Sequence, residues 1–155
     1  MFPQVRGQNL NRQLYTLPRD LEGDLNLVIL AFWQRQQRSV DTWMPFAEKV
    51  STEHPGFRVY ELPVLDRMMI PFRFAIDGGM RSGIPDSGVR GRTITLYLNK
   101  SNFLRSLQIT DQDTIHSLLV TQQGQVLWRA EGDYNKEKGE GLEAVIEAHL
   151  PPSDP

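Results

Sequence analysis

The fold is decided by the stretch NLVILAFWQRQQRSVDTWMPFAEKV, which occupies residues 26–50. Its beginning, residues 26–32, is continuously apolar, which is typical of a central β-strand that is covered on both faces. After a polar segment, apolar side chains recur at helical spacing, at Trp43, Phe46, Ala47 and Val50. The stretch therefore predicts a strand, a loop and an amphipathic helix near 41–53, with Asp41 as its N-cap and Pro45 in its first turns.

Further strands and helices are expected along the rest of the chain. Runs of apolar and β-branched residues bounded by turn residues predict strands at 57–62, 93–98, 116–121 and 125–130. Pro63 is expected to end the first of these strands, and Gly124 lies in the turn of a closing hairpin. Helical spacing predicts helices near 101–108 and 136–150.

The order of these elements predicts the architecture. The chain has 155 residues, which is enough for a single domain with a sizeable core. Residues 1–25 are expected to form an irregular N-terminal extension, and 151–155 a short tail. Strands that alternate with helices form parallel pairs, and a closing hairpin adds an antiparallel edge. We expect an α/β fold: a mixed sheet with helices on both faces, the N-terminal extension, and a C-terminal β-hairpin followed by a helix.

The segment 67–92 combines arginine, methionine, phenylalanine and glycine. A short helix is expected to begin at Pro71, and a loop rich in Gly and Pro should follow it. One interpretation packs the Met and Phe side chains onto the sheet while the arginines face water. The other is a binding surface, because adaptable Met beside Arg suits a protein partner, and Arg also suits carboxylates and phosphates.

Composition excludes several classes of function. The formal net charge is −2, which argues against a general nucleic-acid binder. The chain contains no cysteine, so disulfides, thiolate nucleophiles, Fe–S clusters and sulfur-ligated zinc are excluded. The three histidines lie far apart and no nucleotide-binding or nucleophile-elbow motif occurs, so we expect no metal and no cofactor. No apolar run approaches the roughly 18 residues of a membrane span. With no visible signal or transit peptide we expect a cytoplasmic protein, with an organellar or membrane-peripheral location as the alternative.

The strand, the polar turn and the Met44-Pro45 pair resemble the thioredoxin-like superfamily, especially its peroxiredoxin and periplasmic thioredoxin branch. That resemblance places Gln37 and Val40 where the two redox cysteines would stand. It also implies a cis-proline opposite them, at Thr93 or in the Thr114–Ile115 region, and neither position holds proline. The resemblance therefore implies the fold without the redox activity.

A second resemblance is to the thioredoxin-like mitochondrial assembly factors of ATP synthase. Four short segments carry it, in the same order as in that family: LPRDLEGDLNLV (17–28), VDTWMPF (40–46), RSGIPDSGVR (81–90) and SLLVTQQGQVLWRAEG (117–132). This resemblance implies a role in assembly and a protein partner, such as a membrane-complex subunit.

We expect a partner-binding surface where the loops 33–43 and 81–93 meet. Ligands of open α/β sheets usually lie at the carboxyl ends of the strands, and Trp and Arg are enriched at binding hot spots. The predicted contact residues are Trp33, Arg35, Gln37, Trp43, Arg81, Arg90 and Arg92.

Two alternatives to this surface remain open. The loop 33–40 is equally well explained as a degenerate turn with no function. The same arginines could also form a small-molecule or anion pocket, or the site of an unrecognised enzyme, although we expect the protein not to be an enzyme.

Overall fold

The computed structural model describes residues 1–84 and 86–150, so the predicted tail 151–155 lies outside the described residues. In these residues the strands form one seven-stranded sheet in the order β2-β1-β5-β4-β3-β6-β7. The strands are β1 (Val5–Asn9), β2 (Leu14–Leu17), β3 (Leu25–Ala31), β4 (Phe57–Asp66), β5 (Ile94–Leu98), β6 (His116–Thr121) and β7 (Val126–Glu131). The α-helices are α1 (Gln37–Asp41), α2 (Met44–Glu53), α3 (Arg73–Gly83), α4 (Ser87–Gly91), α5 (Lys100–Ser106) and α6 (Lys136–His149). Two 3-10 helices, η1 (Gln34–Gln36) and η2 (Arg67–Phe72), precede α1 and α3.

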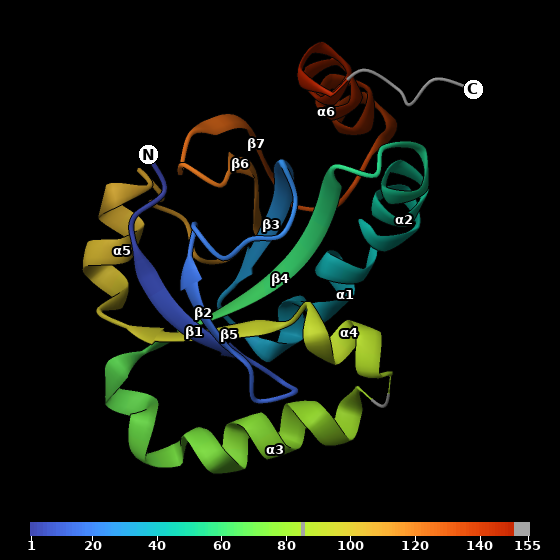
Figure 1. Ribbon diagram of the computed structural model, residues 1–155. Coiled ribbons are helices and arrows are strands. Elements are labelled where there is room, and N and C mark those ends of the chain that lie inside the picture. The colour runs from blue at the N-terminus through green and yellow to red at the C-terminus, as the bar shows by residue number, and fades with distance from the viewer. Residues whose placement is uncertain (85, 151–155) are drawn as a thin grey trace.

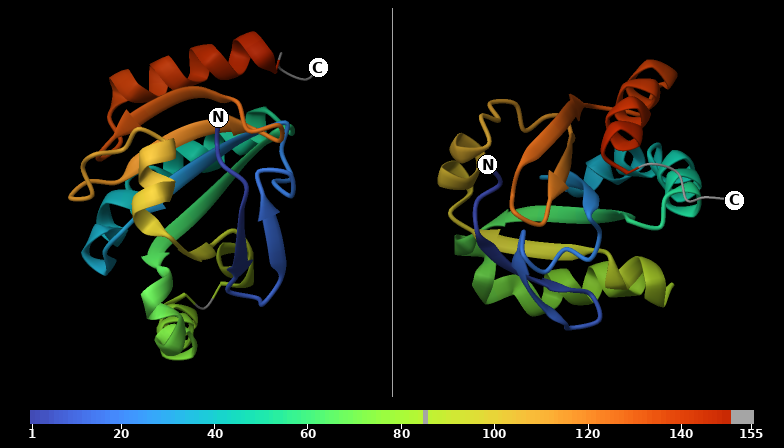
Figure 2. Two further views of the ribbon diagram at one scale, coloured as in Figure 1. Left: turned by 90° about the vertical axis from the view of Figure 1, so that its left-hand side faces the viewer. Right: turned by 45° about the horizontal axis from the view of Figure 1, so that its top comes forward.

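The sheet is mixed and has helices on both faces, as expected. β3 pairs parallel with β4 and antiparallel with β6, and β4 pairs parallel with β5. One hydrophobic cluster joins the sheet to α1, α2 and α6, while a second joins its other face to α5 and the N-terminal segment. Figure 1 shows α5 across the sheet from α1 and α2. Figure 2 shows α3 at the opposite end of the molecule from α6.

The N-terminal extension is not irregular, contrary to expectation. β1 and β2 form an antiparallel hairpin, and β1 continues the sheet by pairing with β5. β1 lies so close to β5 that a Cβ on Gly7 would be 2.7 Å from both Ile94 Cγ2 and Leu96 Cδ2. The strands are too short to give a clear alternating pattern, and only the docking on β5 makes them stable.

The predicted helix 41–53 is two helices, and Asp41 ends the first instead of capping the second. The physical reason is Pro45, which has no N–H to donate to the Asp41 carbonyl and whose ring crowds that oxygen. Pro45 lies in the first turn of α2, as expected. Trp43 lies between the helices and is fully buried.

Pro63 does not end β4, which continues to Asp66. Pro63 is the last residue of β4 to pair with β3, opposite Ala31, and pairing with β5 begins at the next residue, Val64. The residue without an N–H therefore lies where pairing with β3 ends and pairing with β5 begins, and the sheet tolerates proline there.

The segment 67–92 is more helical than expected, because η2, α3 and α4 follow one another along it. α3 begins at Arg73 rather than at Pro71 and continues through Gly78 and Gly79, where a loop was expected. No residue of α3 is buried. α3 is therefore held less firmly than α2, α5 and α6, which all bury side chains.

Two glycine-to-alanine substitutions test whether β1 packs closely against β5 while the surface of α3 is open. Gly7→Ala should lower the free energy of unfolding by roughly 1–3 kcal/mol, because the new methyl group overlaps the side chains of Ile94 and Leu96. The control Gly78→Ala has no heavy atom within 4 Å of its new Cβ, and should raise it by about 0.5–1 kcal/mol. Urea denaturation of the variants measures both; equal effects would contradict the packing of β1 on β5.

Candidate functional site

A cavity of about 860 Å³ opens at the carboxyl ends of β3 and β4. The strands contribute Ala31, Val64 and Leu65 to its walls, and α3 contributes Ile76 and Met80. Because these side chains are apolar, the cavity favours a ligand with an apolar body. Its position is where the resemblance places the redox centre.

The side chains at the two former cysteine positions differ in exposure. Gln37, the first residue of α1, is exposed, lines the cavity and donates a hydrogen bond from Nε2 to Asp41 Oδ1 at 2.9 Å. Val40 is 1% exposed and packs in the core beside α2 and α6. Neither an amide nor an isopropyl group can act as the nucleophile of disulfide exchange.

Glu61 of β4 is a site residue that the sequence analysis missed. It lines the cavity and is only 5% exposed. It shares one face of β4 with the core residues Val59 and Phe57, which lie two and four positions earlier. The sequence pattern that could have indicated it is a glutamate at the alternating positions of a strand that otherwise hold buried apolar residues.

The surroundings of Glu61 favour its uncharged form. Burial raises the pKa of the Glu61 carboxyl, and the negative charge of Asp41 raises it further. The Gln37 side chain, through hydrogen bonding, and the positive charge of Arg92 lower that pKa, but the net shift is upward. A buried carboxyl with a perturbed pKa in a cavity is typical of a functional site.

Arg92 lies beside Glu61 but forms its ion pair elsewhere. The Glu61 main-chain N–H donates to the Arg92 carbonyl oxygen at 2.9 Å. The Arg92 guanidinium instead has Nη2 at 3.6 Å from Glu48 Oε1 and at 3.8 Å from Met44 Sδ. Its Nε is buried and has no hydrogen-bond partner among the described residues. Arg92 therefore moderates the charge of Glu61 without neutralising it in a direct pair.

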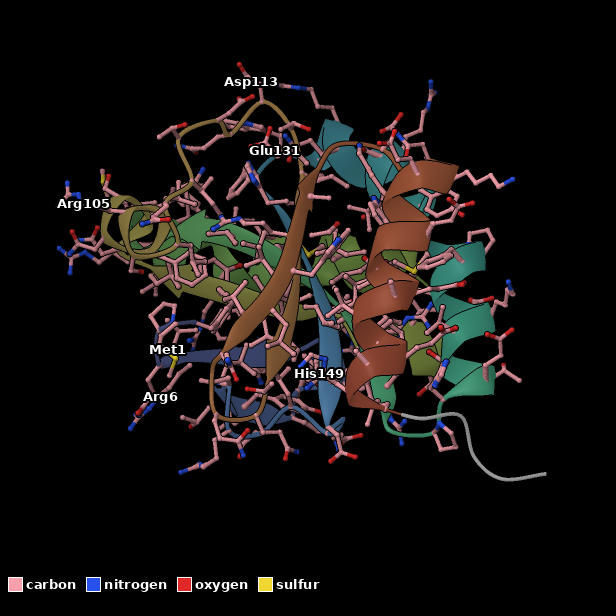
Figure 3. The ribbon with its side chains drawn as sticks, turned by 90° about the horizontal axis from the view of Figure 1, so that it is seen from above. Met1, Arg6, Arg105, Asp113, Glu131 and His149 are labelled. Carbon is pink, nitrogen blue, oxygen red and sulfur yellow. The ribbon has the colours of Figure 1, made fainter. Side chains whose placement is uncertain are left out.

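Trp33 forms the exposed rim of the cavity. Its side chain is 48% exposed, and Lys100 Nζ and Arg35 Cζ lie 4.8 Å and 5.5 Å from the centre of its rings. Arg35 also pairs with Asp113, at 3.6 Å between Nη2 and Oδ1. Figure 3 shows Asp113 and Glu131 near one end of the sheet. Exposed contacts of this kind contribute little to stability, so the rim is free to serve binding.

The structure brings only part of the predicted surface together. Trp33, Gln37 and Arg92 line the cavity, and Arg35 lies beside Trp33. Arg81 of α3 and Arg90 of α4 are half-buried and do not line the cavity.

Trp43 requires a correction, because it belongs to the core and presents no surface to a partner. It is fully buried, and its Nε1 donates to the Gly132 carbonyl oxygen at 3.0 Å. Its ring packs edge-on against Trp128 and Tyr134. The residue type suggested a binding hot spot, whereas the helical spacing of Trp43 with Phe46 and Val50 indicated a core position.

Only one of the predicted arginines lines the cavity in the described part of the chain, so the structure does not favour the predicted anion pocket. Among the described residues that line it, Arg92 is the one arginine, whereas Glu61 and Asp41 supply two carboxyl groups. The balance of charge therefore favours a cation over an anion.

An exposed apolar surface lies on η2 and the first turn of α3. We call it the Met/Phe surface, and its members are Met68, Met69, Ile70, Phe72 and Phe74. Phe74 is 80% exposed and Phe72 is 59% exposed, so the expectation that these side chains pack on the sheet is wrong. The local sequence did not decide this, because an apolar helix face is the same whether it meets a sheet or a partner.

Two further features bear on the site. Among residues 1–84 and 86–150, no three histidine, aspartate or glutamate side chains converge in a way that could hold a metal ion. In the same residues, none of the helices combines the length and apolarity that crossing a membrane requires.

Known structures resemble this chain, although no family model and no curated protein matches it. The thioredoxin domain of a thiol-disulfide oxidoreductase from Bacteroides vulgatus has a TM-score of 0.59 at 18% identity, with 94% of each chain covered. An exposed lipoprotein thioredoxin from Streptococcus pneumoniae has a TM-score of 0.59 at 11% identity, covering 94% of this chain and 99% of that one. Yeast Sco1 with copper bound has a TM-score of 0.65 at 11% identity, covering 97% of this chain and 91% of that one. The chain therefore has a thioredoxin-like fold, as the sequence resemblance implied.

Replacing Glu61 by its uncharged isostere tests the electrostatics of the cavity. A raised pKa means that the folded protein holds this proton more tightly than the unfolded chain, so stability falls as pH rises above the ordinary value of 4.5 through the folded pKa. Glu61→Gln removes this penalty. The variant should be more stable than the wild type at pH 8, and the difference should shrink at pH 4.

Urea denaturation at the two pH values measures this difference. Glu147→Gln, on the exposed face of α6, is the matched control and should change the free energy of unfolding by no more than about 0.5 kcal/mol. If Glu61→Gln were no more stable at pH 8 than at pH 4 relative to the wild type, the burial of a charged carboxylate would be refuted.

Proposed function

We propose that this thioredoxin-like chain is a non-redox binding protein, an assembly factor or chaperone that docks a protein partner on the Met/Phe surface. The observation that carries the proposal is the exposure of five large apolar side chains in one short segment. Soluble proteins seldom leave contiguous apolar surface of this kind uncovered unless it binds something.

The chemistry of the chain supports binding over redox catalysis. Disulfide exchange needs a thiolate, and the sequence has no cysteine at Gln37, at Val40 or anywhere else. The names of the similar structures describe oxidoreductases and a copper-bound protein, at identities that carry the fold alone. Their activities therefore give no support for catalysis here.

The composition of the Met/Phe surface indicates what kind of partner fits. Methionine side chains adapt to different apolar shapes, and phenylalanine supplies a large contact area. Arg67 and Arg73 are exposed beside them, and the Arg73 guanidinium lies 5.0 Å from the centre of the Phe74 ring. An apolar protein segment flanked by acidic residues complements this surface in both hydrophobicity and charge.

The partner class to test first comes from the second sequence resemblance. Four segments of this chain are similar to assembly factors of mitochondrial ATP synthase, which makes a membrane-complex subunit such as one of ATP synthase the first candidate. The Met/Phe surface follows the second parallel strand directly, because η2 begins where β4 ends.

Removing two aromatic rings tests the docking surface. Phe72→Ser combined with Phe74→Ser should leave the melting temperature nearly unchanged, because both rings are exposed and bury little area. Capture of the native partner should fall roughly tenfold or more, since exposed aromatic anchors dominate binding energy. Quantitative mass spectrometry of complexes cross-linked in detergent-solubilised host extract measures the capture.

The matched control is Leu14→Ser, which removes a side chain that is 82% exposed on β2, at the far edge of the sheet. It should retain every protein that the wild type captures. A folded double Phe variant that captures the same proteins at full yield would refute the docking surface.

A further inference from the structure

The cavity at the end of β3 and β4 has the dimensions of a small-ligand site. Its volume of about 860 Å³ lies within the roughly 300–1,000 Å³ of such sites. The walls are formed by strand residues such as Val64 and by one face of α3, which includes Ile76 and Met80. A ligand that fills this space therefore has an apolar body.

The polar groups of the cavity select for positive charge. The Glu61 side chain is buried, with an exposed fraction of 5%. Among the described residues, none forms an ion pair with it. Asp41 adds a second carboxylate at the wall, and the nearby cation, Arg92, is engaged by Glu48. A carboxylate or phosphate ligand would meet repulsion from Glu61 and Asp41, whereas a cation would be attracted by both.

The buried Glu61 carboxylate lowers the stability of the protein without a ligand, but it would stabilise a bound cation. Burial of its carboxylate is costly when no charge lies in direct contact. A cation in the cavity would supply that contact at a carboxyl group that is only 5% exposed, where charge-assisted hydrogen bonds are strong. A group that reduces stability and lines a cavity is best explained by binding.

From this geometry we infer that the cavity binds a protonated amine carried on an apolar chain, with the ammonium group held by Glu61. An ammonium group is compact and has three donors, which suits a single buried carboxylate with the Gln37 carbonyl oxygen as a second acceptor nearby. The amine belongs either to a small molecule or to a lysine of a protein segment, since both offer the same chemistry.

This site is separate from the Met/Phe surface. The α3 residues that line the cavity, Ala75, Ile76, Gly79, Met80 and Gly83, follow the spacing of one helix face. Phe72 and Phe74 do not line the cavity and are exposed. The inference therefore does not rest on the proposed docking of a partner, and either can fail alone.

Titration of the purified protein with n-hexylamine, followed by calorimetry at pH 8, tests the inference. The wild type should bind hexylamine, and Glu61→Gln should weaken the binding roughly tenfold or more, because the charge-assisted contact is lost. Hexanoate should bind at least tenfold more weakly than hexylamine. Equal binding of hexanoate and hexylamine, or hexylamine binding that Glu61→Gln leaves unchanged, would overturn the proposal.

A second pair of variants, which keeps Glu61 unchanged, tests whether the amine enters the cavity. Gly79 lines the cavity and Gly78 does not, and neither has a heavy atom within 4 Å of an added Cβ. Gly79→Leu should weaken hexylamine binding, while Gly78→Leu should not. Equal effects of the two substitutions would refute binding inside the cavity.

The pH dependence of binding gives an independent readout. The groups that face Glu61 are Asp41 and Arg92, with Glu48 paired to the latter. Hexylamine stays protonated below about pH 10, so its affinity should fall as the pH is lowered and Glu61 takes up its proton. Glu61→Gln should weaken this dependence, with the carboxylate of Asp41 remaining at the wall; a wild-type profile that the variant reproduces would contradict the role of Glu61.

Short peptides distinguish the two sources of the amine. An acetylated Leu-Lys-Leu amide is compared with its norleucine counterpart, which has no charge. Preference for the lysine peptide over hexylamine supports a protein segment as the ligand, and the reverse supports a small molecule. The double variant of Phe72 and Phe74 should bind hexylamine as the wild type does, so loss of partner capture and loss of amine binding are told apart.

Discussion

The parallel pairing of β3 with β4 is the constraint on which the rest of the structure depends. The register runs from Leu25 opposite Phe57 to Ala31 opposite Pro63, and it brings the carboxyl ends of both strands to one edge of the sheet. The Trp33 rim and the cavity lie at this edge, and the helical segment that begins with η2 follows β4 directly. The same register places Glu61 opposite Ile29, within a buried part of the sheet. A shift by one residue would turn Glu61 to the other face.

Glu61 shows how stability and binding oppose each other in this fold. Most residues of the α1 and α2 face, such as Phe57, Val59 and Trp43, form a well-packed apolar cluster. Glu61 interrupts that face with a carboxyl group whose pKa is raised by burial. The interruption falls where the helical cover changes from α1 and α2 to the loosely packed α3, so the cavity forms where the core is least complete. The cavity therefore offers a buried carboxyl group, whereas no residue of this chain can supply a thiolate.

The regular elements could be predicted because each carries its own local pattern. The apolar run of β3, the closing hairpin of β6 and β7, and α6 lie within about a residue of their expected positions. The hairpin of β1 and β2 could not be predicted, because its short strands are stabilised by pairing with β5, far along the chain. Asp41 was wrongly predicted as the N-cap of a single helix. Pro45 cannot donate a hydrogen bond to the carbonyl group four residues earlier, so the first helix ends at Asp41. Of the predicted site, Trp33, Gln37 and Arg92 line the cavity, whereas Glu61 was missed.

The sequence by itself determined the order of the strands from β3 to β7, and it excluded thiolate chemistry, because a chain without cysteine cannot form a thiolate in any fold. Only the tertiary structure decided that Trp43 is buried while Phe72 and Phe74 are exposed. Only the tertiary structure, too, placed Glu61 in a cavity with Asp41 and Arg92. Periodicity shows that a residue lies on an apolar face. What covers that face is set by contacts between segments far apart in the chain, and burial and charge at the site follow from those contacts.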